Sequence, residues 1–134
     1  DESYSIIQRR VRPPEIHALP VELRELGPSY RATDPEGVQR WLAIERVSHP
    51  VGSLDLTGQT PQDPITFARL ETMKVPVLVI CGDADLLSPP ALMRLFADRI
   101  PDCRFETMPE AGHAAFWEQP DIWNKLVLEF IGQH

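Results

Sequence analysis

Two polar residues that could share acid–base chemistry follow two strand-like segments of the chain. Asp85 comes after the apolar run 75–81, and His113 comes after the segment 103–108. If the segments are neighbouring parallel strands about 4.8 Å apart, their carboxyl ends meet at one edge of the sheet. A carboxylate placed there can fix the tautomer of a histidine and stabilise the imidazolium that forms during proton transfer. The sequence therefore predicts an Asp–His pair at this edge.

Each of these residues also has an ordinary structural explanation. An aspartate after a strand often only caps the next helix, as Asp83 or Asp85 could do. A histidine that follows a glycine in a loop, as His113 follows Gly112, is usually a surface residue. The catalytic interpretation depends on both side chains lying together at adjacent strand ends.

Residues 74–134 have the alternation of strands and helices that would position this pair. The run 75–81 is almost continuously apolar and rich in β-branched residues, which is typical of a parallel strand buried on both faces. A helix is expected over 88–99, a second strand over 103–108 and a last helix over 120–132. This order predicts a right-handed parallel crossover.

Residues 1–73 contain helical segments separated by prolines and no convincing strand. Helices are expected over 34–49, 15–26 and 63–74, of which the first and the third begin with Asp-Pro. The basic cluster 9–12 runs into two prolines, and we interpret it as a solvated turn.

The composition limits the class of protein. The 134 residues are 43% hydrophobic and 25% charged, which is an ordinary globular balance for one domain. No apolar run reaches the ~18 residues of a membrane span, and a formal net charge of -7 opposes nucleic-acid binding. Cys81 and Cys103 form no metal or disulfide motif, so we expect free thiols, no metal and a cytoplasmic location.

Two motifs in residues 74–134 resemble those of the α/β-hydrolase family. The segment 78–89, LVICGDADLLSP, is similar to the family's buried strand followed by G-x-x-D-x-x-x-P. The segment 111–120, AGHAAFWEQP, is similar to its G-H-x-x-x-x-E-x-P pattern. The resemblance implies that Asp85 is the acid and His113 the base of a catalytic triad, and the two residues are 28 positions apart. Asp83 falls at a variable position of the motif.

The same resemblance implies an α/β fold in which this chain forms only part of the sheet. Residues 74–134 would be the C-terminal strand–helix–strand–helix part of the core, and residues 1–73 a helical cap. The family's nucleophile lies on a G-x-S-x-G elbow ahead of the acid and the histidine. The nearest segment here is GPSYR at 27–31, which ends in arginine and follows no apolar strand, so Ser29 is interpreted as a turn residue.

We therefore expect the chain to be the C-terminal half of a hydrolase. It would pack against a separate polypeptide, the N-terminal half of the same hydrolase, which carries the nucleophile. Cleavage of an ester or related acyl bond in a small-molecule substrate is implied, with no organic cofactor. Candidates for lining the substrate pocket are Trp41, Leu87, Phe116 and Trp117.

Two alternatives stay open. An aspartate in place of the nucleophilic serine would give epoxide or haloalkane hydrolysis on the same fold. A non-catalytic module that uses the helical cap as a ligand surface is the second alternative. The residue at the missing elbow distinguishes the first, and covalent labelling by a fluorophosphonate distinguishes the second.

Overall fold

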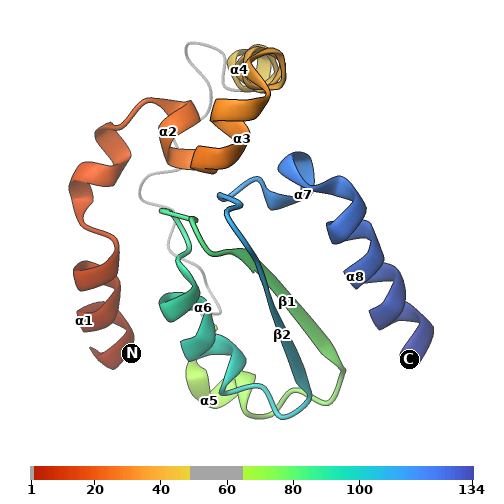
Figure 1. The fold of residues 1–134 in the computed structure, drawn as a ribbon. Coiled ribbons are helices and arrows are strands. Elements are labelled where there is room, and N and C mark those ends of the chain that lie inside the picture. The colour runs from red at the N-terminus through yellow and green to blue at the C-terminus, as the bar shows by residue number, and fades with distance from the viewer. Residues whose placement is uncertain (1, 49–64) are drawn as a thin grey trace.

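The computed structural model describes residues 2–48 and 65–134 (Figure 1). In chain order, its elements are α1 (Glu2–Val11), the 3-10 helix η1 (Pro14–Ala18), α2 (Val21–Glu25), α3 (Pro28–Thr33), α4 (Pro35–Ser48), α5 (Phe67–Leu70), β1 (Val77–Gly82), α6 (Pro90–Ala97), β2 (Cys103–Met108), α7 (Ala115–Glu118) and α8 (Pro120–Gln133). None of the described helices is long and apolar enough to cross a membrane.

The two described strands form the predicted parallel pair. The register runs without a break from Val77 opposite Cys103 to Gly82 opposite Met108. The strand β1 begins later than the apolar run suggests, because Pro76 has no N–H to donate to a ladder. The first ladder bond on this side is donated by the Val77 N–H to the Asp102 carbonyl, at 2.9 Å.

Helices flank this pair on opposite sides, with α1 and α6 on one and α8 on the other (Figure 1). On the α6 side, the Tyr4 ring of α1 lies 5.1 Å from the Phe96 ring, measured between centroids. On the α8 side, Trp123 and Leu126 pack against the fully buried Met108 at the end of β2. Helices α2, α3 and α4 gather beyond the carboxyl ends of both strands (Figure 1). A second small core there contains Leu26, Val38 and Ala114.

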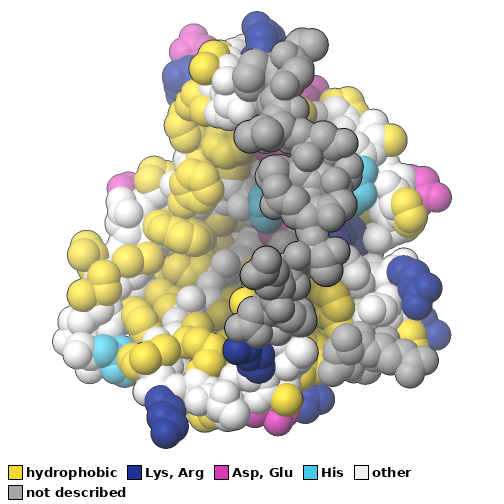
Figure 2. Space-filling view, turned by 180° about the vertical axis from the view of Figure 1, so that it is seen from behind, with side chains coloured by type: hydrophobic (Ala, Val, Ile, Leu, Met, Phe, Trp, Pro, Cys, Tyr) yellow, Lys and Arg dark blue, Asp and Glu magenta, His cyan; other side chains and the backbone are white. Residues whose placement is uncertain are grey.

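The outer edge of β1 carries no neighbouring strand among the described residues. An apolar groove of about 460 Å³ follows it between α6 and α8. Seven hydrophobic residues line it: Leu78, Val79, Ile80, Met93, Trp123, Val127 and Phe130. From behind, hydrophobic side chains are seen gathered over a broad, hollowed area (Figure 2).

The N-terminal expectations need correction at two places. The segment 15–26 is not one helix but η1 and α2, because Pro20 disfavours helical backbone at Leu19, which is extended with φ -67° and ψ 148°. The basic cluster 9–12 is not a turn. It forms the last turn of α1 and the residue after it.

The remaining helix boundaries differ by a few residues from the expected ones. The helix α4 matches the segment 34–49 up to Ser48, and position 49 lies outside the described residues. Of the segment 63–74, only Phe67–Leu70 is helical, and positions 63 and 64 also lie outside the described residues. The helix α6 ends at Ala97, and α8 continues through Gly132 to Gln133.

Candidate active site

The structure brings Asp85 and His113 together as the sequence predicts. Asp85 lies in the loop after β1 and is 5% exposed, whereas the side chain of His113, in the loop after β2, is 46% exposed. Asp85 Oδ2 lies 2.9 Å from His113 Nδ1. Because a carboxylate can only accept, Nδ1 carries the proton, and the lone pair of a neutral imidazole is left on Nε2.

The other oxygen of Asp85 fixes the aspartate within its own loop. Oδ1 accepts the N–H groups of Leu87 and Ser88, both at 2.8 Å. The Leu87 carbonyl in turn accepts a bond from Arg12 Nη1 at 2.9 Å. Residues 83–89, the loop between β1 and α6, are called the acid loop below. This loop is held by hydrogen bonds to its own Asp85 side chain and by a hydrogen bond from Arg12, the residue that follows α1.

The hydrogen bond that His113 donates to Asp85 is the largest influence on the pKa of the histidine. It raises the pKa of His113 above the ordinary histidine value, and partial burial opposes this rise. The negative charges of Asp85 and Glu25 raise it further, and Arg24 lowers it. A histidine with a raised pKa is a stronger base in its neutral form, so the pair suits proton abstraction from a weak acid.

Asp83, the weaker candidate for the acid, has a structural role. Its Oδ1 accepts the backbone N–H of Glu110. Glu110 lies near the start of residues 109–114, the loop between β2 and α7 that carries His113 and is called the histidine loop below. Glu110 has a φ of 60°, in the left-handed region that non-glycine residues rarely adopt. Asp83 therefore supports a turn in the histidine loop rather than the histidine itself.

The histidine loop lies directly on the end of β1. A Cβ added to Gly82 would overlap the backbone carbonyl oxygens of Ala111 and Gly112. The absence of a side chain at Gly82 therefore allows the two loops to approach closely enough for the Asp85–His113 hydrogen bond.

Of the four candidate pocket residues, two lie beside the histidine. Trp41 and Leu87 line a pocket of about 290 Å³ together with His113. Phe116 and Trp117 instead line a neighbouring hollow of about 440 Å³. They still contact the first pocket indirectly, because their rings lie 6.2 and 5.6 Å from the Trp41 ring.

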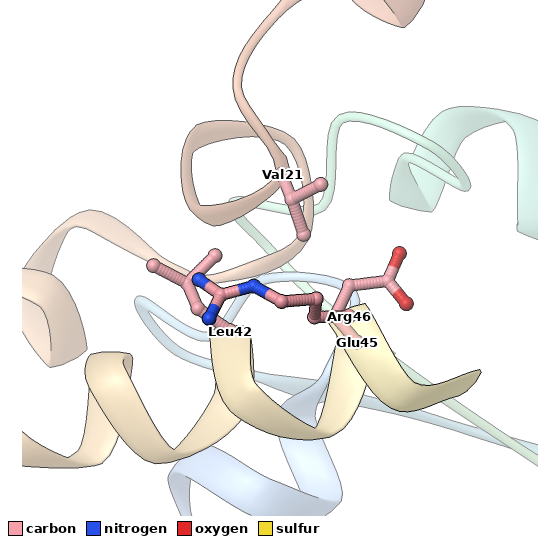
Figure 3. Close-up of a pocket in the computed structure, with 4 residues that line it drawn as sticks. All are labelled: Val21, Leu42, Glu45 and Arg46. Atoms are coloured by element: carbon pink, nitrogen blue, oxygen red, sulfur yellow. The ribbon is translucent and has the colours of Figure 1, made fainter. Parts of the chain in front are cut away.

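A third hollow lies between α2 and α4 but carries no comparable chemistry. Figure 3 shows Val21 facing α4, with the Arg46 guanidinium extended towards Leu42 and the Glu45 carboxylate directed the other way. Its volume of about 300 Å³ resembles that of the histidine pocket, yet it contains no acid–base pair. The site is therefore identified by the Asp–His geometry and not by pocket size.

Ser29 does not take the place of a nucleophile. It lies in the first turn of α3, and its hydroxyl donates a hydrogen bond to the Glu110 carboxylate. Both cysteines are free thiols, as expected, because Cys81 pairs with Thr107 in the register while Cys103 begins β2 opposite Val77. Among residues 2–48 and 65–134, no three His, Cys, Asp or Glu side chains gather in a way that could hold a metal ion.

Three residues of this region escape sequence reasoning. Arg12 carries no motif that connects it to Leu87. Glu25 supports the histidine loop through its backbone carbonyl, which accepts the Ala114 N–H at 3.0 Å. Glu118 accepts the Gly112 N–H at 2.9 Å, and only its fixed place in the pattern after His113 could have drawn attention to it.

Comparison with solved structures identifies the fold. The chain superposes over 98% of its length on BpoC of Mycobacterium tuberculosis, provisionally named a non-heme bromoperoxidase, with a TM-score of 0.66 and 27% identity. It superposes over 99% of its length, with a TM-score of 0.62 and 16% identity, on MGS-M2, an α/β-hydrolase enzyme from a deep-sea metagenome library. The chain has the fold of part of an α/β-hydrolase. It spans about half the length of these two neighbours, 50% in both cases.

Sequence comparison agrees over a shorter segment. BpoC is 38% identical over 78 residues, which are 58% of this chain and 28% of that protein. A 2-hydroxy-6-oxononadienedioate/2-hydroxy-6-oxononatrienedioate hydrolase of Paraburkholderia phymatum is 33% identical over 78 residues, 27% of its length. No protein-family model matches the chain. The α/β-hydrolase fold of this chain therefore rests on structural superposition and on these shared segments.

Proposed function

We propose that this chain supplies the acid and the base of a hydrolase that cleaves ester or related acyl bonds. The observation that carries the proposal is the 2.9 Å contact between Asp85 Oδ2 and His113 Nδ1 beside an open pocket. The relative from Paraburkholderia phymatum, which is named a hydrolase, supports hydrolysis as the reaction class.

The geometry assigns a role to each atom of the pair. Neutral His113 accepts the proton of a nucleophile at Nε2 while Nδ1–H remains bonded to Asp85. The resulting imidazolium is stabilised by the Asp85 carboxylate and then protonates the leaving group. Backbone N–H donors from a segment outside these 134 residues stabilise the oxyanion.

The pocket beside His113 suggests a small apolar substituent on the substrate. Trp41, Ile44 and Leu87 supply an apolar wall, and the imidazole lies at its margin. An edge contact from the Phe116 ring and a tilted contact from the Trp117 ring support Trp41 in this wall. We propose that an acyl or alcohol group of the substrate binds there, under the helical cap formed within residues 1–73.

The open edge of β1 supports a partner that contains further strands. An edge strand flanked by an apolar groove favours pairing with another strand, and a two-stranded pair is too small to be stable by itself. Relatives of the same fold are twice as long. We therefore propose that the N-terminal half of the same hydrolase covers this face and brings the nucleophile.

Solution behaviour tests the partner. Light scattering should show the isolated 134-residue chain as aggregates or as unfolded material. Co-expression with a polypeptide that contains the nucleophile elbow should give a soluble one-to-one complex. A cooperatively folding monomer of 15.2 kDa would contradict the proposed partner.

Covalent labelling tests the reaction. In the assembled protein, a fluorophosphonate should label one serine of the partner, and short-chain p-nitrophenyl esters should be hydrolysed. An aspartate nucleophile would instead leave the probe unreacted and give turnover of an epoxide or a haloalkane. Tight ligand binding with neither reaction would identify a binding module, and the proposed hydrolysis would be wrong.

A further inference from the structure

The backbone on both sides of His113 is held, on one side by Glu118 of α7 and on the other by the last residue of α2, Glu25. The preceding residue, Gly112, donates its N–H to Glu118 Oε1 at 2.9 Å. The following residue, Ala114, donates its N–H to the Glu25 carbonyl at 3.0 Å. The imidazole is therefore carried by a peptide segment whose two ends are fixed independently.

The carboxylate of Glu118 also reaches across to the residues between α2 and α3. Its second oxygen, Oε2, accepts the Gly27 N–H at 3.0 Å, although the two residues are 91 positions apart. The two backbones touch here, since a Cβ on Gly112 would lie 2.5 Å from the Gly27 nitrogen. The Glu118 side chain thus joins the histidine loop to the residues between α2 and α3 where the two backbones touch.

We propose that Glu118 is a positioning residue for His113, whose carboxylate clamps Gly112 to Gly27 and so holds the imidazole against Asp85. The proposal rests on the proposed function in taking His113 as the base. The claim that the clamp sets the Asp85–His113 hydrogen bond can be tested without measuring enzymatic activity.

A carboxylate suits this position better than any other side chain. Two N–H donors approach two different oxygens, and each bond gains from the negative charge. A glutamine would offer one oxygen and one NH₂ group, so one of the two backbone donors would face another donor. An aspartate is one methylene shorter and could not span both donors. Half-burial raises the pKa of Glu118, while both N–H groups and Arg31 lower it, and Asp85 adds to the rise.

The decisive experiment follows the His113 imidazole by ¹⁵N NMR in the assembled protein, in which the chain is bound to its partner. Substitution of His113 by Asn assigns its signals among those of the four histidines. We expect Glu118→Gln to lower the pKa of His113 towards the ordinary value, to a point between wild type and Asp85→Asn. Amide exchange at Gly27 and Gly112 should accelerate in the same variant, while β1 and β2 amides keep their protection.

Two further variants make the measurement specific. Glu36→Gln removes one negative charge from an exposed position in the first turn of α4, and it should leave the titration of His113 unchanged. Glu118→Asp should keep one of the two bonds and give an intermediate shift. If the Glu118→Gln protein loses the exchange protection of its β1 and β2 amides, Glu118→Asp is used for the test in its place.

The outcomes separate this inference from the proposed function. Faster exchange at Gly27 and Gly112 with an unchanged titration of His113 would overturn the positioning role and leave Glu118 a purely structural residue. Unchanged exchange would overturn the clamp itself. If Asp85→Asn also leaves the titration unchanged, the Asp–His pair fails, and with it the proposed function.

Discussion

Asp85 divides its two carboxylate oxygens between His113 and its own loop. Oδ2 faces the imidazole at 2.9 Å, and Oδ1 accepts two consecutive backbone N–H groups. The orientation of the acid is therefore fixed without help from the histidine. An aspartate held in this way selects the Nδ1–H tautomer and leaves Nε2 for chemistry.

Replacement of Asp85 by Asn should reverse the tautomer. The asparagine oxygen can still accept from the Leu87 and Ser88 N–H groups, so its NH₂ group would face Nδ1 as a donor. Neutral His113 would then carry its proton on Nε2, and its pKa would fall because the bond that raises it is lost. Imidazole ¹⁵N shifts distinguish the two tautomers directly.

The pH dependence of stability follows from the same bond. Because folding raises the pKa of His113, the contribution of the pair is fully present below the unfolded pKa, about 6.5. It is lost as the pH rises through the folded pKa. Denaturant unfolding of wild type and Asp85→Asn should therefore show a difference in pH slope confined to that window. Parallel slopes would contradict the pairing.

His113→Ala should abolish turnover in the assembled hydrolase while leaving the fold intact. The side chain is half exposed. Above the folded pKa of His113, where the contribution of the pair to stability is lost, we expect little loss of stability. The loss of the base should lower kcat/KM by roughly 10³-fold or more. His17→Ala, at an exposed position of η1, is the matched control and should retain full activity.

Gly82→Ala should destabilise the protein and displace the histidine loop. The new methyl group would meet the backbone carbonyls of Ala111 and Gly112, which cannot rotate away as a side chain could. Overpacking of this kind costs about 1–3 kcal/mol. Gly132→Ala is the control, because nothing lies within 4 Å of its Cβ and alanine has a higher helix propensity than glycine in the last turn of α8. Thermal unfolding should move in opposite directions in the two variants.

The two thiols should differ in accessibility although neither is bridged. Cys81 is 5% exposed and Cys103 is only partly buried, and burial raises the pKa of both. In the native protein, iodoacetamide should modify Cys103 slowly and Cys81 hardly at all. In denaturant without reductant, mass spectrometry should find both modified. If neither thiol were modified, the two cysteines would form a disulfide, which the strand register forbids.

The Asp85–His113 pair could be predicted because strand ends set it. Two strands in a parallel pair leave little freedom to the residues that follow them. The segment 15–26 was less predictable, since its apolar spacing suits a helix and only Pro20 divides it. The pocket was predicted only in part. Trp41 and Leu87 line it together because α4 lies beside the acid loop, and sequence patterns do not show where α4 is placed.

The supports of the site could not be predicted. Arg12 meets Leu87 across 75 positions, and Glu118 meets Gly27 across 91. Such contacts depend on where whole helices are placed. The sequence around an arginine or glutamate does not show whether its side chain will bind a backbone group far along the chain. The sequence identifies residues that carry chemistry more readily than those that hold them.

The unbroken register between β1 and β2 fixes the ends of both strands, whatever the length of the segment that connects them. The position of each loop is determined by its own strand, so the length of the connection through α6 does not set the distance from Asp85 to His113. Residues 98–102, which link α6 to β2, lie at the opposite end of the sheet from the pair. Insertions at these positions should therefore preserve the Asp85–His113 pair. The interval of 28 positions follows from the length of α6 and its connections and is not required by the geometry of the pair.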